Sequence, residues 1–185
     1  MNKHTKDRSA KVNQMGSGSD YWAAPSSPMN VLAWNCWGLG STSVVWIFTD
    51  EVKSKRPILS FLAKTKASSS KVKGILNKLE LTQGISIPSD GQSGGLVMLW
   101  TEGTDIHFKS CSHLHIDVVV VGEHGMPPWR AMGFYEHPNA SKRHTSWKLL
   151  EILKEQCDMP WVVFGDFNEI TQLDEKLGWL DRDAK

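Results

Sequence analysis

Apolar residues recur along this chain in short runs between turn residues, with longer stretches of helical spacing among them. Short continuous apolar runs predict buried strands, and apolar residues three and four positions apart predict the buried face of a helix. Ser68 and Ser141 are the expected N-caps of two helices. The predicted helices are Ser43 to Lys55, Ser68 to Glu80 and Ser141 to Cys157, and the predicted strands are Met29 to Trp34, Ile58 to Leu62, Gly84 to Pro88, Gly95 to Thr101, Ile106 to Cys111, His113 to Val121, Trp129 to Tyr135 and Trp161 to Phe164.

Two compositional blocks divide the 185 residues. Met1 to about Pro28 mixes basic residues with Gly, Ser and Pro, so we expect a disordered leader that cannot bury enough apolar surface to fold. The rest, residues 29–185, is expected to form one domain. Strand-rich stretches with helices between them predict an α/β or α+β fold in which two packed sheets are flanked by helices.

Charge and cysteine usage narrow the class of protein only slightly. The formal net charge is +1, which by itself gives no argument for a nucleic-acid partner. The three cysteines have no zinc-site spacing and no even pairing, which indicates reduced thiols in the nucleus or cytoplasm. No apolar run is long enough to cross a bilayer and no secretory signal is seen, so we expect an intracellular protein without a membrane partner.

Polar residues follow four predicted strands, where active-site loops commonly lie. They are Asn35, the triplet Lys64 to Lys66, Tyr135 to Pro138, and Asp166 with Asn168. Asp-x-Asn at a strand end places both side chains on one face, where a carboxylate could bind Mg²⁺ or activate water and an amide could bind a phosphate oxygen. By itself the same tripeptide is more typical of a turn.

The order and spacing of these clusters resemble the endonuclease/exonuclease/phosphatase (DNase-I-like) family over about Met29 to the C-terminus. Two further phrases resemble the plant LINE-type branch, which serves non-LTR retrotransposons. The resemblance implies a four-layered α/β/β/α sandwich, incomplete at the C-terminus, and a magnesium-dependent phosphodiesterase that nicks DNA, with no small-molecule cofactor. The matching motifs are Asn35 to Gly40, Lys64 to Lys66, Ser93 to Leu96, Tyr135 to Pro138 and Gly165 to Ile170, and the LINE-type phrases are Ser141 to Trp147 and Leu173 to Lys176.

The resemblance also implies roles for individual residues. Those expected in catalysis orient the catalytic carboxylate, contact the scissile phosphate, activate water and bind the phosphate. Two others are expected to contact the DNA, and two would contribute to the metal shell. The implied catalytic residues are Asn35, Tyr135, Asp166 and Asn168, the substrate-binding residues are Arg143 and His137, and the metal ligands are Asp166 and Asn168.

Lys64 departs from the family pattern, because the family has at this position the glutamate that is its principal metal ligand. The family's final Asp-His pair is also absent, and His113 and His115 are expected to be ordinary strand residues. Trp37 and Trp46 stand where the family commonly has arginine, which fits the drift of an unselected copy, although both could simply pack in the core.

Three functions therefore stay open. The first is an active Mg²⁺-dependent endonuclease domain of a retroelement; because Lys64 replaces the carboxylate that this activity needs, we expect this copy to be catalytically impaired. The second is a non-catalytic remnant with no activity or weak nucleic-acid binding. The third is an unrelated α/β interaction domain. Whether the chain is an enzyme, which DNA it would cut and its oligomeric state are not decided by the sequence.

Overall fold

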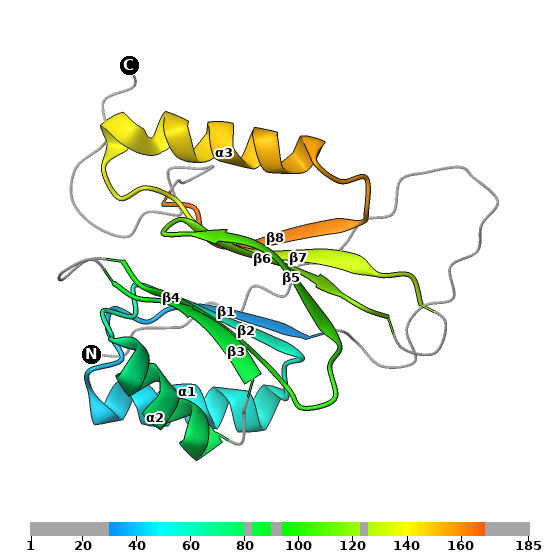
Figure 1. Ribbon diagram of the computed structural model, residues 1–185. Coiled ribbons are helices and arrows are strands. Elements are labelled where there is room, and N and C mark those ends of the chain that lie inside the picture. The colour runs from blue at the N-terminus through cyan, green and yellow to red at the C-terminus, as the bar shows by residue number, and fades with distance from the viewer. Residues whose placement is uncertain (1–29, 80–82, 90–93, 123–125, 169–185) are drawn as a thin grey trace, which may run out of the picture.

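Two four-stranded β-sheets lie face to face in the computed structural model (Figure 1). The structure describes residues 30–79, 83–89, 94–122 and 126–168. The expected leader and the second LINE-type phrase lie outside these residues. The helices are α1 (Thr42–Lys55), α2 (Ser69–Leu79) and α3 (Arg143–Glu155), with a short 3₁₀ helix η1 (Ala140–Lys142), and the strands are β1 (Val31–Asn35), β2 (Leu59–Ala63), β3 (Gln83–Ile87), β4 (Leu96–Trp100), β5 (Ile106–Ser112), β6 (His115–Val120), β7 (Trp129–Tyr135) and β8 (Trp161–Asp166).

Each sheet contains one parallel strand pair joined by a helix. The strand orders are β1-β2-β4-β3 and β5-β6-β7-β8. β1 pairs with β2 in parallel across α1, and β7 pairs with β8 in parallel across α3, whereas the other pairs are antiparallel. Parallel neighbours end at the same edge of a sheet, and β1 also contacts β8 of the other sheet. The carboxyl ends of these four strands therefore come together.

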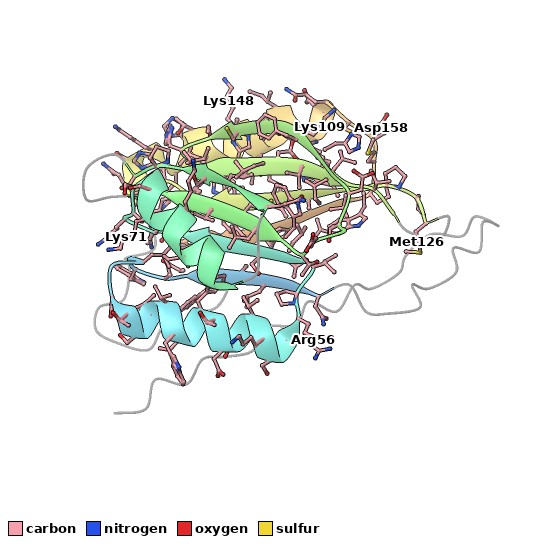
Figure 2. The ribbon with its side chains drawn as sticks, turned by 60° about the horizontal axis from the view of Figure 1, so that its bottom comes forward. Arg56, Lys71, Lys109, Met126, Lys148 and Asp158 are labelled. Carbon is pink, nitrogen blue, oxygen red and sulfur yellow. The ribbon has the colours of Figure 1, made fainter. Side chains whose placement is uncertain are left out.

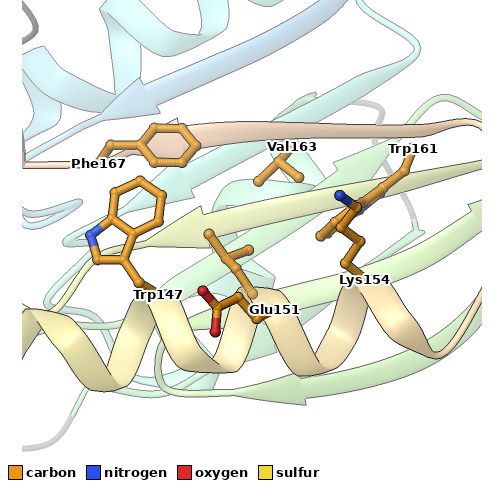
Figure 3. A pocket seen from close by; sticks show the side chains of 7 residues that line it. Trp147, Glu151, Lys154, Trp161, Val163 and Phe167 are labelled. Atoms are coloured by element: carbon orange, nitrogen blue, oxygen red, sulfur yellow. The ribbon is translucent and has the colours of Figure 1, made fainter.

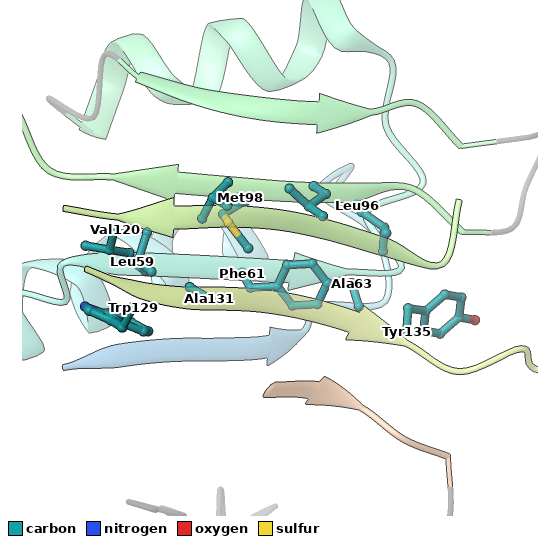
Figure 4. Packing of buried hydrophobic residues seen from close by; sticks show 11 residues of the cluster. Leu59, Phe61, Ala63, Leu96, Met98, Val120, Trp129, Ala131 and Tyr135 are labelled. Carbon is teal, nitrogen blue, oxygen red and sulfur yellow. The ribbon is translucent and has the colours of Figure 1, made fainter. Parts of the chain in front are cut away.

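The main core fills the space between the two sheets. Phe61 of β2 is fully buried there (Figure 4). Its ring packs edge-on against that of Phe164, with ring centroids 6.0 Å apart. Gly133 of β7 makes room for this ring, because a Cβ at that position would lie 2.1 Å from the Phe61 Cδ2 atom. The close approach explains why a glycine stands in the middle of this buried strand. Other members of this core are Leu59, Leu96, Met98, Ile116, Val118, Val120, Trp129 and Ala131.

The helices cover the outer faces of the sheets (Figure 1). Phe48 and Val52 of α1 and Val72 of α2 bury their side chains against the sheet that contains β2 and β4. The Trp34 and Phe48 rings stack with centroids 5.9 Å apart. α3 covers the other sheet and buries Leu153 in its last turn. Within the described residues, no helix is long and apolar enough to cross a membrane.

A buried ion pair connects α3 to the sheet of β5, β6, β7 and β8. The Arg130 guanidinium on β7 donates from Nε and Nη2 to the Asp117 carboxylate on β6, with its shortest contact at 2.6 Å. The two side chains are only 2% and 1% exposed. Arg130 Nη1 also donates to the Leu153 carbonyl, and the guanidinium lies 5.0 Å from the centroid of the Trp161 ring. One charged side chain therefore links β6, β7, β8 and α3.

His115 lies buried on β6 between two serine hydroxyls. Its ring nitrogens Nε2 and Nδ1 lie 3.0 Å and 2.8 Å from the hydroxyl oxygens of Ser110 and Ser112. Burial lowers the pKa of His115, and the positive charge of Arg130 lowers it further, whereas the charge of Asp117 acts in the opposite direction. The fold therefore favours the neutral imidazole.

We expect His115 to make the folded state less stable as the pH falls below about 6.5, the ordinary histidine pKa. Below that pH the unfolded chain binds the proton that the folded ring resists, so the unfolded state binds more protons and the free energy of unfolding decreases. Urea denaturation at about pH 7.5 and about pH 5.5 should show this decrease. The decrease should be smaller in His115→Gln, and an equal decrease in both proteins would contradict the assignment to His115.

Several local predictions are corrected by the structure. Ser141 does not cap the third helix; the Asn139 side chain instead accepts from the Ser141 N–H at the start of η1, because an Asx turn forms directly after Pro138. His113 lies in the turn between β5 and β6 rather than in a strand. Trp37 and Trp46 do not pack in the core, since they are 69% and 67% exposed. The other element ends differ from prediction by one or two residues, as fraying ends commonly do.

Candidate active site

Four of the predicted site residues meet where the strands end. Asn35 is the last residue of β1, Tyr135 of β7 and Asp166 of β8, and Asn168 follows β8 by two positions. The Asn35 Nδ2 atom donates to Asp166 Oδ2 at 2.6 Å, which joins the two sheets at this edge. The convergence expected from the strand ends is thus present, while the catalytic roles of these residues stay predictions.

The Asp166 carboxylate accepts from three donors. Besides Asn35, the Lys64 Nζ atom lies 2.8 Å from Oδ2, and the Asn168 backbone N–H donates to Oδ1 at 3.1 Å. The Lys64 and Asp166 side chains are only 12% and 17% exposed, so solvent screens this ion pair less than it would a surface pair. The carboxylate that could bind a cation or activate water is therefore held by the chain's own ammonium.

Lys64 is fixed in place by its backbone and by two aromatic rings. Its φ of 56° lies in the left-handed region, which a residue with a side chain seldom adopts. The adjoining residues are tied down, because the Thr65 N–H donates to the Gly95 carbonyl at 3.1 Å. The Lys64 Nζ atom lies 4.6 Å from the Trp37 ring centroid and 5.4 Å from that of Tyr135. The ammonium thus sits between one carboxylate and two ring faces.

Tyr135 and Cys36 keep their protons at neutral pH. Burial raises the pKa of the Tyr135 phenol, and the negative charge of Asp166 raises it further, so the phenol can act as a hydrogen-bond donor. Burial also raises the pKa of the Cys36 thiol, whose Sγ donates to the Ala63 carbonyl at 3.3 Å. Cys36 is therefore a packing residue rather than a nucleophile.

Asn168 is also held by the segment after β7. Its φ is 48°, and its Nδ2 atom donates to the Glu136 carbonyl at 2.9 Å. Glu136 in turn donates its N–H to the Asp166 carbonyl at 2.9 Å. The Asn168 side chain is therefore tied through its amide nitrogen to the segment that follows β7.

The two residues expected to contact DNA lie against the protein. The Arg143 Nε atom is 3.6 Å from the carboxylate of Glu136, which is fully buried, and the Arg143 side chain is 12% exposed. The His137 Nδ1 atom accepts from the Asn139 N–H at 3.0 Å, while the His137 N–H donates to the Ser146 hydroxyl. Both residues support the turn after β7, and their proposed contact with DNA stays a prediction.

A divalent cation does not fit the described residues of this site. Within the described part of the chain there is no group of three or more His, Cys, Asp or Glu side chains that could hold a metal ion. Mg²⁺ prefers several oxygen ligands, yet both Asp166 oxygens accept from protein donors and one of those donors is the Lys64 ammonium. A cation bound to Asp166 would therefore meet a positive charge.

An apolar hollow of about 290 Å³ is lined in part by Phe167, which lies between Asp166 and Asn168 in the sequence (Figure 3). It is situated between α3 and β8. The Trp147 and Phe167 rings stack across one end of it, with centroids 6.1 Å apart. Its lining residues are Trp147, Leu150, Glu151, Lys154, Trp161, Val163 and Phe167.

Sequence reasoning missed three features of the site. These are the Lys64–Asp166 ion pair, the burial of Glu136 and the position of the Trp37 ring over the Lys64 ammonium. Only the Trp37 contact had a local signal, since Trp37 lies two residues after Asn35 in a motif already singled out. The ion pair joins segments far apart in the sequence, so no local pattern could predict it.

Comparison with known proteins finds solved structures whose fold is similar to that of this chain. No protein-family profile matches the sequence, and no curated protein matches it. The human Nocturnin catalytic domain with bound sulfate superposes with a TM-score of 0.59 at 12% identity, over 77% of this chain and 65% of that one. A Neisseria 3′ phosphatase, NExo, bound to a product DNA hairpin has a TM-score of 0.56 at 16% identity, over 76% and 58%.

An AP endonuclease from Archaeoglobus fulgidus is also similar, with a TM-score of 0.52 at 17% identity over 75% of this chain and 56% of that one. These neighbours are DNase-I-like endonuclease/exonuclease/phosphatase fold proteins. The expected mixed α/β fold with two sheets is therefore confirmed. This chain spans less than two thirds of the length of each of the three neighbours.

Proposed function

We propose that this chain is the endonuclease-like domain of a plant LINE-type retroelement and that Lys64 impairs its phosphodiesterase site. Residues 29–185 would form the domain, as part of a four-layered α/β/β/α sandwich, behind a disordered leader at residues 1–28. Support for a nuclease origin comes from the fold neighbours that process DNA and from the ordered motifs of the sequence. The observation that carries the impairment is the 2.8 Å contact between Lys64 Nζ and Asp166 Oδ2.

The chemistry of phosphodiester cleavage explains the impairment. In-line attack requires an activated water and groups that stabilise the charge developing on the phosphate oxygens. Asn35 and Tyr135 are suitable donors to such oxygens. Among the described residues, Asp166 is the carboxylate at the strand ends that contacts Asn35, and its three accepted bonds occupy most of the acceptor positions of the carboxylate.

Nicking of supercoiled plasmid DNA tests this proposal. With Mg²⁺ present, the chain should relax the plasmid no faster than the Asp166→Ala variant, because the carboxylate already serves the ion pair with Lys64. Parallel reactions with chelator and with Asp166→Ala exclude a contaminating nuclease. Chelator-sensitive nicking that Asp166→Ala abolishes would show that the site is active and would refute the proposed impairment.

A further inference from the structure

Trp37 is an exposed indole held in an unfavourable backbone conformation beside the candidate site. It is 69% exposed, and its φ of 53° lies in the left-handed region. An exposed large aromatic ring gains little from burial, and a left-handed φ adds strain of order 1 kcal/mol or more. Strain retained beside a candidate site points to a function for this ring rather than to packing.

Three lysines surround the loop that carries Trp37. The Lys64 and Lys66 Nζ atoms lie 4.6 Å and 5.8 Å from the Trp37 ring centroid. The Lys71 Nζ atom lies 3.5 Å from the Gly40 carbonyl of the same loop, at one end of the molecule (Figure 2). Asp166 offsets the charge of Lys64, so the positive charge beside the loop comes from Lys66 and Lys71, in a chain whose net charge is only +1.

The loop and the lysine segment form one fixed unit. Cys36 N–H donates to the Ala63 carbonyl at 3.1 Å, and Leu39 N–H donates to the Thr65 carbonyl at 2.7 Å, so both sides of Trp37 are tied to the strand-end segment. The Lys66 N–H is bound to the Gly94 carbonyl at 3.2 Å. The backbone that carries the ring and the lysines is therefore fixed before any ligand arrives, which reduces the entropy lost on binding.

We infer that Trp37, Lys64 and Lys66 form a binding site for single-stranded nucleic acid that works without a metal ion. A nucleobase stacks on the exposed indole while the ammonium groups bind the neighbouring phosphates, which is how single strands are bound without sequence preference. An ammonium has three N–H donors, so Lys64 can donate to a phosphate while it stays paired with Asp166. Duplex DNA fits less well, because its bases are already stacked on one another.

This inference rests on the proposed function, since it names the ligand class of the same impaired site. The residues that would bind the strand are the ones that exclude the cation. Lys64 places an ammonium group next to Asn35, and the N–H donors that it does not use for Asp166 can bind a phosphate. A domain that no longer cleaves could therefore retain binding.

Fluorescence anisotropy of a fluorescein-labelled single-stranded oligo(dT), measured with EDTA present, tests the inference. The natural chain should bind the strand, more weakly as salt is raised. Trp37→Ala and Lys66→Glu should each weaken binding about fivefold or more, because each removes a stacking or phosphate contact. An oligomer of the same length with abasic sugars should bind the natural chain more weakly by a similar factor, and Trp37→Ala should not distinguish the two strands.

Two matched control variants distinguish binding at this site from nonspecific binding elsewhere on the surface. Trp46→Ala removes a ring that is 67% exposed on α1, and Lys109→Glu reverses an exposed charge on β5, the strand at the far end of the sheet from β8. Both controls should bind oligo(dT) like the natural chain, and circular dichroism should show that all variants are folded.

Equal binding by Trp37→Ala and the natural chain would overturn the inference, as would equal binding of duplex and single strand or no binding of oligo(dT) at all. None of these outcomes bears on the proposed impairment. The nicking assay measures cleavage in the presence of Mg²⁺, whereas the anisotropy assay contains EDTA and measures binding alone. Nicking activity in the natural chain would refute the proposed impairment whether or not oligo(dT) binds in EDTA.

Discussion

Lys64→Glu is expected to bind Mg²⁺ far more tightly than the natural chain does. The substitution removes an ammonium 2.8 Å from Asp166 Oδ2 and puts a second carboxylate in its place. Two unit charges about 4 Å apart interact by about 4 kcal/mol near a protein surface, and a divalent ion roughly doubles this value. Repulsion is thereby exchanged for attraction, although the flexible lysine stem makes the full repulsion an upper bound.

Isothermal titration calorimetry measures the Mg²⁺ affinity of the natural chain and of Lys64→Glu. We expect the affinity of the variant to be well over tenfold higher than that of the natural chain. Lys64→Met is the matched control, because it frees Asp166 from the ammonium but adds no oxygen ligand. It should therefore bind Mg²⁺ more weakly than Lys64→Glu. Binding by the natural chain that equals that of Lys64→Glu would show that the ammonium does not occupy the cation position.

Asp117→Leu is expected to lower the free energy of unfolding by about 3–5 kcal/mol, the range for removing one partner of a buried ion pair. The Arg130 guanidinium, 2% exposed, would stay buried without its carboxylate. Its bond to the Leu153 carbonyl cannot balance the charge. Most of the loss therefore comes from the arginine left behind rather than from the hydrogen bonds themselves.

The double variant Asp117→Leu/Arg130→Met separates these two contributions. With both charges gone, apolar side chains can fill the space between the sheet and α3, so the double variant should be clearly more stable than Asp117→Leu alone. Urea denaturation measures all the free energies of unfolding. Asp105→Asn, at a side chain that is 64% exposed, is the surface control and should change stability by less than about 0.5 kcal/mol. A double variant as unstable as Asp117→Leu would contradict the buried-charge explanation.

The amino-acid sequence alone determined most of the secondary structure and the general location of the site. The apolar run at Trp161 and the helical spacing before Lys55 are local patterns, and both correspond to elements of the fold. The polar residues after β1, β7 and β8 also indicated where a site would lie, because parallel strands deliver their carboxyl ends to one edge. These predictions hold because alternation and periodicity depend on neighbours a few positions away.

Only the tertiary structure decided which charges face one another. Asn35 and Asp166 are 131 positions apart, yet their side chains share a hydrogen bond. Arg130 and Asp117 interrupt apolar strands and gave no sign in the sequence that they would be buried as a pair. The position of Lys64 suggested a lost ligand by resemblance, but its direct contact with Asp166 depends on a left-handed backbone and on how two sheets pack. Such contacts arise from the assembled fold, because the energy of a charge depends on everything that surrounds it in space.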